Sequence, residues 1–303
     1  MSLFKTVVAY RISPKWVAPS LEALNEALAS KVFTPCGPAQ QESVGWVPPR
    51  GEDYAPLVEN IAQQLILKLS IERKSVPASA VAAALAERCK EIEATTGRKP
   101  GRKEKKELKE DIALALLPRA FSKQASHFVW VDPSNRLVVV GAGSHNAADH
   151  VINSLIEATA IAGSLMPVTA LSTNVAPSTA MADWLTTQEA PAGFSVDRDL
   201  ELRAVDESKS SVRYARHNLE LAEIVEHITK GKVPTQLALT WDSRVSFALT
   251  TDLVIKKIEI LDVVTDEGAE GFDGDVAITT AELIKLIPDL LTALGGELVF
   301  SED

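Results

Sequence analysis

An α+β fold, with mixed or antiparallel sheets and packed helices, is predicted by two patterns in the sequence. Apolar residues alternate over short segments that follow one another directly, which is typical of antiparallel strands and hairpins. Other segments place apolar residues at helical spacing, but they do not alternate regularly with the strands as in a doubly wound parallel sheet. The length of 303 residues suits one large domain or two to three lobes.

Two strands and one helix are expected in the N-terminal quarter. Residues 3–12 alternate enough to form a strand, and Ser20 is placed to cap a helix that reaches about residue 30. Residues 34–51 are rich in proline and glycine, so loop and edge structure is expected there, not a central strand. Residues 64–72 alternate with a period of two and predict the second strand.

A pair of helices follows, separated by a break at residues 97–101. Pro77 suits the first turn of a helix that reaches about residue 93. Cys89 falls on the apolar stripe of this helix, so core packing is its expected role. The second helix covers about residues 103–117 and is ended by Pro118.

The C-terminal half contains further elements of both kinds. Its last helix is expected to be capped by Thr279 or Thr280, kinked by Pro288 and ended at Gly295-Gly296. The other elements are a hairpin of residues 127–132 and 136–140, helices at 147–162, from 180 and at 219–230, and a meander of strands at 237–241, 245–249 and 254–260. The sub-regions are an N-terminal α+β part (1–75), a basic helical arm (76–122), a central α+β part (123–230) and a C-terminal meander with its helix (231–303).

Charge is distributed unevenly along the chain, whose formal net charge is −10. Residues 98–109 include seven basic side chains, and residues 68–123 hold 14 Lys/Arg against 8 Asp/Glu. Residues 259–303 hold 12 Asp/Glu, and Lys285 is their one base. The sequence therefore predicts one basic and one acidic surface, and the local field matters more to a polyanion than the total charge.

The helix at 103–117 separates its side chains by type. At 100° per residue the helix has a basic stripe, an apolar stripe and an acidic side. The basic stripe is Arg102, Lys105, Lys106 and Lys109, the apolar stripe is Leu108, Ile112, Ala115 and Leu116, and the acidic side is Glu104, Glu107 and Asp111. A basic stripe of this kind indicates contact with a nucleic-acid backbone, although a merely solvated helix face or a docking site for an acidic partner, such as the acidic C-terminal region of another copy, gives the same pattern. Aromatic residues make up 5% of the chain, so a base-stacking platform is not indicated. The residues expected to contact DNA are Arg73, Lys74, Arg98, Lys99, Arg102, Lys105, Lys106, Lys109, Arg119, Lys123, Arg213 and Arg216.

An enzyme built around a nucleotide cofactor is the alternative reading. Residues 137–146 imitate the strand, glycine turn and helix of a dinucleotide-binding unit, but Asn146 stands where the third glycine belongs. His145 and His150 are five residues apart and do not share a helix face, so no metal site is expected. No phosphate loop or nucleophile elbow occurs in the sequence. We therefore predict no catalytic residue, no metal and no cofactor.

Compartment is indicated by what the sequence does not contain. It has two cysteines, no apolar stretch of about 18 residues, and no signal peptide at its N-terminus, where Lys5 and Arg11 interrupt a short apolar run. A reducing cytoplasm without membrane attachment is expected.

Several short motifs, in order from end to end of the chain, resemble those of the bacterial recombination-associated RdgC family. The likeness is weakest over residues 172–215 and 262–275. The motifs are Leu3-Phe4-Lys5, Tyr10-Arg11, Phe33-Thr34-Pro35-Cys36-Gly37, Gly45-Trp46-Val47-Pro48-Pro49, Leu116-Leu117-Pro118-Arg119-Ala120-Phe121-Ser122, Leu237-Ala238-Leu239-Thr240-Trp241 and Ala293-Leu294-Gly295-Gly296-Glu297.

The resemblance implies a function. It implies a non-enzymatic homodimer, closed into a ring, that binds single- and double-stranded DNA without sequence preference. It also implies association with the nucleoid and antagonism of RecA-driven strand exchange through occupation of DNA. Phe121 matches a subunit-contact residue of the family, with an ordinary core aromatic as the alternative, and Lys74 matches a basic position that we expect to contact DNA.

Overall fold

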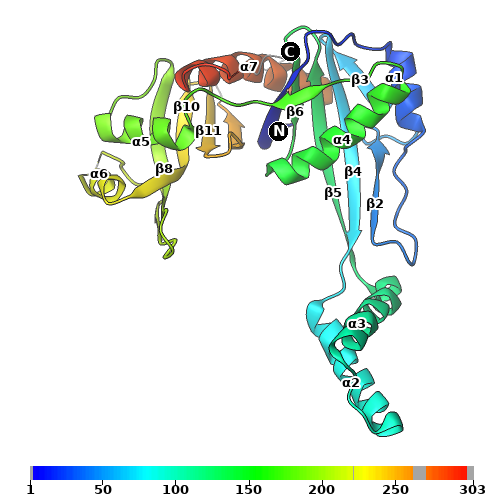
Figure 1. Ribbon diagram of the computed structural model, residues 1–303. Coiled ribbons are helices and arrows are strands. Elements are labelled where there is room, and N and C mark those ends of the chain that lie inside the picture. Colours follow the sequence, from blue (N-terminus) through cyan, green and yellow to red (C-terminus); the bar gives the residue numbers. More distant parts are fainter. Residues whose placement is uncertain (1–2, 221, 262–270, 299–303) are drawn as a thin grey trace. The chain divides into compact units, whose positions relative to one another are not determined.

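Two compact units make up the chain. A computed structural model describes residues 3–220, 222–261 and 271–298. The larger unit contains residues 1–27, 48–67 and 127–303, and the smaller unit contains residues 28–47 and 68–126. Across the described residues the chain has seven α-helices and a large antiparallel sheet, which confirms the predicted α+β class (Figure 1).

The strands follow one another mostly as antiparallel neighbours. Hydrogen bonds join them in the order β4, β5, β6, β1, β12, β11, β10, β8 and β9, with β2 and β3 pairing with β4 and β7 with β1. The strands are β1 (Thr6–Ile12), β2 (Glu42–Val47), β3 (Val58–Ile61), β4 (Gln64–Lys74), β5 (Ser122–Asp132), β6 (Leu137–Val140), β7 (Val168–Ala170), β8 (Phe194–Ala204), β9 (Ser211–Tyr214), β10 (Lys232–Trp241), β11 (Val245–Thr250) and β12 (Ile255–Ile260).

The helices divide between the two units. The larger unit contains α4 (His145–Ile161), α5 (Pro177–Thr187), α6 (Ala222–Thr229), α7 (Phe272–Ala293) and most of α1 (Leu21–Ala29). The smaller unit contains α2 (Ala78–Thr96), α3 (Arg102–Leu116) and the 3₁₀ turn η1 (Leu117–Arg119). Both strands that flank this helical pair, β4 and β5, run through both units.

Most elements lie where the sequence predicts them. The first strand, the helix after Ser20, the helical pair, the hairpin of β5 and β6 and the meander of β10, β11 and β12 are all present. The Ser20 hydroxyl accepts a hydrogen bond from the amide of Ala23 (3.2 Å), as expected for a helix cap. Strand β2 lies at one end of the hydrogen-bonded order, which confirms edge structure in the proline-rich segment.

Gly45 explains why this edge strand can be covered. The backbone of residues 31–33 runs against Trp46, and the amide of Phe33 donates to the Trp46 carbonyl (3.0 Å). A Cβ atom at position 45 would lie 2.3 Å from the Cα of Phe33. Glycine is therefore required here by the close approach of two backbones.

One expectation about the elements is wrong. The last helix begins at Phe272, seven residues before the predicted caps, and both Thr279 and Thr280 are buried within it. The Thr280 hydroxyl donates to the carbonyl of Val276 (2.9 Å), which satisfies the polar group inside the helix. Pro288 lies inside this helix, as expected, and the kink predicted there stays a prediction. Strands β3, β7, β8 and β9 were not predicted at all, although Leu200 and Leu202 alternate with polar residues in β8.

The core of the larger unit is apolar on both sides of its central strands. Val7, Val139 and Leu239 are fully buried, and one face of α7 contributes Leu283, Leu286 and Leu290 to the same cluster. Strand β6 is buried at all four positions. Burial of such side chains contributes about 1.5–3 kcal/mol each relative to exposure, so this cluster is the main source of the unit's stability.

A buried ion pair attaches α7 to the meander. The Glu282 side chain is 4% exposed and accepts two hydrogen bonds from Arg244, at 2.6 and 2.8 Å. These bonds hold the pKa of Glu282 below its usual value, against the opposing effect of burial. A bidentate pair of this kind also fixes the rotation of α7 on the sheet.

Changing Glu282 to glutamine is expected to lower the free energy of unfolding by about 1–2 kcal/mol at neutral pH, since charge-assisted hydrogen bonds are lost. A folded-state pKa below the unfolded value gives stability that is present above the unfolded pKa and lost as the pH falls. The deficit should therefore shrink in acid, below about pH 4.3. Urea unfolding of the wild type and the variant, at neutral pH and below about pH 4.3, measures the difference in free energy of unfolding. A deficit that persists unchanged in acid would contradict the role of the charge.

Candidate nucleic-acid interface

The basic helix α3 forms a hairpin with α2 (Figure 1). Gly97 ends α2 in the left-handed conformation (φ 71°), where glycine is favoured. The Glu104 side chain accepts a hydrogen bond from the amide of Gly101 (3.4 Å) and so helps to start α3. The apolar stripe of α3 is half-buried at Leu108 and Ile112, as the helical spacing predicts. The hairpin thereby leaves the basic stripe exposed.

Some cations of the smaller unit are already neutralised. Arg98 donates to both carboxylate oxygens of Glu104 (2.8 and 3.3 Å), an interaction that raises the pKa of Arg98 and lowers that of Glu104. The other pairs of opposite charge described in the smaller unit are Arg73–Glu42, Arg88–Glu91 at 2.7 Å, Lys99–Glu93 at 3.7 Å, Lys103–Glu107 at 4.0 Å and Lys106–Glu110 at 4.0 Å. These bases are less available to an external anion.

Five predicted DNA contacts remain without such a partner. In the part of the chain that the structure describes, no carboxylate lies within 4.0 Å of Arg102, Lys105, Lys109, Arg119 or Lys123, and all five residues are exposed. Three of them lie on the stripe of α3, and the other two flank Phe121 at the start of β5. Unneutralised cations on one rigid helix are the arrangement that phosphate groups favour.

Lys74 has a different environment. Its ammonium group donates to the carbonyl of Gly37 (2.8 Å), and the residue is half-buried. Nearby, the buried Glu72 accepts a hydrogen bond from the amide of Cys36 (2.6 Å). Hydrogen bonds from the Ser122 hydroxyl and from this amide lower the pKa of Glu72. The pKa of the Cys36 thiol is raised, first by burial and second by the negative charge of Glu72. Lys74 therefore helps to hold the loop before β2, in addition to its predicted contact with DNA.

Phe121 is the most exposed aromatic of the smaller unit, with 92% of its surface accessible. Its carbonyl accepts a hydrogen bond from the amide of Ser75 (3.4 Å). This bond joins the residue before β5 to the residue after β4. The reading of Phe121 as a core aromatic is therefore wrong. Leu114, on α3, is also exposed, at 62%.

The remaining predicted contacts, Arg213 and Arg216, belong to the larger unit. Arg213 lies on β9, opposite Glu201 of β8, and Arg216 follows β9. The Asp199 carboxylate accepts hydrogen bonds from the amide of Arg216 and from the ammonium group of Lys257, both at 2.9 Å. Sequence reasoning missed Asp199 and Lys257, because strand β8 was not predicted and a carboxylate inside a basic patch has no motif.

The turn at residues 141–146 does not form a dinucleotide site. Strand β6 pairs antiparallel with both β5 and β1, so the parallel crossover of such a unit is missing in these neighbours. Ser144 caps α4 by accepting from the amide of Ala147 (3.4 Å), and His145 contacts the carbonyl of Asp252 (2.6 Å). The cofactor-enzyme alternative is not favoured.

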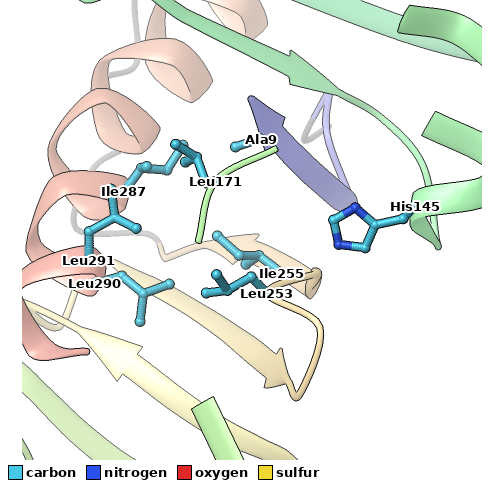
Figure 2. Close-up of a pocket in the computed structure, with 8 residues that line it drawn as sticks. All are labelled: Ala9, His145, Leu171, Leu253, Ile255, Ile287, Leu290 and Leu291. Carbon is cyan, nitrogen blue, oxygen red and sulfur yellow. The ribbon is translucent and has the colours of Figure 1, made fainter. Parts of the chain in front are cut away.

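An apolar pocket beside His145 is too small for a cofactor. Its volume is about 20 Å³, roughly the space for one water molecule. Figure 2 shows His145 at one side of it and the leucine and isoleucine side chains of α7 at the other. A space of this size is a small gap between packed apolar side chains and not a binding site.

The described residues contain neither a metal-binding cluster nor a membrane-spanning helix. Within residues 3–220, 222–261 and 271–298, no three His, Cys, Asp or Glu side chains are grouped so that they could hold a metal ion. In the same ranges, every helix is too short or too polar to cross a membrane.

Comparison with known proteins gives a consistent result. The family model described as "Putative exonuclease, RdgC" matches residues 2–297. A recombination-associated protein RdgC of Herminiimonas arsenicoxydans is 43% identical, over 97% of this chain and 98% of the relative. The proteins of the same name from Janthinobacterium sp. (strain Marseille) and Dechloromonas aromatica (strain RCB) are 41% and 42% identical, over 97% and 98% of this chain and 98% of each relative.

Proposed function

The chain belongs to the RdgC family of recombination-associated proteins, and we propose that it binds single- and double-stranded DNA through the phosphate backbone, without sequence preference. The basic stripe of α3 carries this proposal. Arg102, Lys105 and Lys109 are exposed on one helix and have no carboxylate within 4.0 Å among the described residues. Binding releases counterions from the phosphates, and the salt dependence of affinity is the measurable consequence.

The functional form is a homodimer closed into a ring around DNA, with Phe121 at a subunit contact. A phenylalanine that is 92% exposed gains apolar burial when a second copy covers it. Closure then opposes escape of DNA by topology, so weak contacts with individual phosphates suffice. Non-specific sites typically have Kd near 10⁻⁴–10⁻⁶ M.

Occupation of DNA is the proposed route to recombination control. A protein bound along the backbone limits the access of RecA to the strand, and strand exchange falls without any chemical step. The proposal assigns no catalytic residue, cofactor or metal, and it places the protein in the cytoplasm at the nucleoid.

Retention on circular DNA tests encirclement. After loading at low salt, a high-salt wash should release the protein from linear duplexes and not from closed circles of the same sequence, because screening removes the ionic contacts and leaves only topology. Equal release from both forms would reject the ring and leave backbone binding intact. The basic stripe of α3 could instead dock on an acidic protein. In that case DNA would release the protein from an acidic partner no better than simple salt does.

A further inference from the structure

A second cationic cluster, in the larger unit, is built around Asp199 rather than around an open helix face. Its members come from three elements: Asp199 from β8, Arg213 and Arg216 from β9 and its end, and Lys257 from β12. Asp199 Oδ2 accepts from the Lys257 ammonium group and Oδ1 from the Arg216 amide, both at 2.9 Å. Arg213 contributes a further favourable charge to the carboxylate.

The donors around Asp199 are the kinds that bind phosphate oxygens. Ammonium and guanidinium groups together with backbone amides make most contacts to nucleic-acid phosphates. The Asp199 side chain is 30% exposed and that of Lys257 is 54% exposed, so solvent reaches both partners. An external anion can therefore approach the Lys257 ammonium group that the carboxylate now holds.

The backbone holds both donors in uncommon conformations. Arg216 has φ 54° and Lys257 has φ 52°, in the left-handed region that residues other than glycine rarely adopt. The ladder between β11 and β12 also shifts register beside Lys257, between Ser246 and Ala248. Such departures cluster at binding sites. Here they aim an amide and an ammonium group at the same carboxylate.

The local charge contrasts with that of its unit. The larger unit has 16 basic and 32 acidic residues. Three other charged side chains of β8 are already engaged: Arg203 is paired with Glu201 (3.2 Å), and Asp197 accepts from the Thr240 hydroxyl (2.8 Å). Asp199 therefore offsets the charge of Lys257 in an otherwise acidic unit.

We propose that Asp199 is an internal stand-in for a DNA phosphate, which keeps Lys257 and Arg213 pre-organised and gives up Lys257 to the backbone when DNA binds. The inference rests on the proposed function and adds a second, carboxylate-gated phosphate site to it. Asp199 still accepts the hydrogen bond from the Arg216 amide when DNA is bound, so the turn after β9 does not move.

Three variants of the full chain test the proposal through the salt dependence of duplex affinity. Lys257→Gln should lower affinity about eightfold at 0.1 M salt and reduce the slope of log K against log salt by about 0.9, the contribution of one phosphate. Asp199→Asn should raise affinity two- to eightfold, because the amide oxygen still accepts from Arg216 but no longer neutralises Lys257. Lys230→Gln removes a cation from α6 that pairs with Glu226, and it should change neither quantity.

The outcomes separate the two levels of the proposal. Affinity that is unchanged or lowered in Asp199→Asn, with a melting temperature equal to that of the wild type, would make Asp199 a structural residue and overturn the inference. Normal DNA binding by Lys257→Gln would overturn it too, while leaving the α3 interface untouched. A wild-type chain that binds no DNA would reject the proposed function itself.

Discussion

Reversing the charges of Lys105 and Lys109 to glutamate is expected to lower the affinity for duplex DNA about 60-fold at 0.1 M salt, because two phosphate contacts, each with a salt exponent of about 0.9, are lost. The slope of log K against log salt should fall by about 1.8. Both side chains are exposed on α3, with no carboxylate within 4.0 Å in the described chain. Titration of fluorescent duplexes of unrelated sequence at several salt concentrations measures affinity and slope together.

A matched control lies outside the stripe on the same helix. Lys103 is also exposed but is 4.0 Å from Glu107, and at helical spacing it lies about 160° around the axis from Lys105. Lys103→Glu should therefore change the slope far less per charge than the stripe variant. Equal effects per charge would mean that DNA responds only to the net charge of the unit, and the assignment of a face would be lost.

The contrast between β5–β6 and β8 explains which elements could be predicted from the sequence. The hairpin of β5 and β6 has a turn in which Asp132 accepts from the Asn135 amide (3.0 Å), so local chemistry marks it. Strand β8 has a register shift against β10, which interrupts its alternation, and its hairpin with the nearby β9 was missed together with it. An interrupted alternation hides a strand even where one of its partners is close in sequence.

The start of the last helix could not be predicted correctly from the sequence. A threonine before an apolar run resembles a cap, yet Thr279 and Thr280 lie inside α7, where Thr280 bonds back to Val276. The helix begins earlier, with Asp273 and Asp275 in its first turn and the Phe272 ring centroid 5.1 Å from the Arg50 guanidinium carbon. The sequence carries no local sign of that contact.

Part of the candidate site could be predicted from the sequence and part could not. The wheel of α3 predicted an exposed basic stripe, because the side-chain direction in a helix follows from spacing alone. It did not predict that Arg98 is neutralised by Glu104, six residues away across the helix start, or that Lys257 meets Asp199. Which cations remain free depends on tertiary neighbours, and a count of bases in the sequence overestimates the interface.

Changing Phe121 to alanine is expected to weaken the proposed homodimer about 30- to 1000-fold, the range of an aromatic hot spot worth about 2–4 kcal/mol. The side chain is 92% exposed in the single chain, so its loss removes little burial within the subunit and should leave the melting temperature unchanged. Phe121→Tyr keeps the aromatic surface and should retain the dimer. Sedimentation over a dilution series measures the dissociation constant.

The same variant separates closure of the ring from backbone binding. Each Phe121→Ala subunit keeps its α3 stripe, so the salt slope for short duplexes should stay close to that of the wild type, while retention on circular DNA at high salt is lost. Tyr54→Ala removes an aromatic that is fully exposed on the larger unit and should affect neither. An unchanged dimer in Phe121→Ala would show that the subunits meet elsewhere. A weakened dimer with intact retention on circles would show that closure does not hold the DNA.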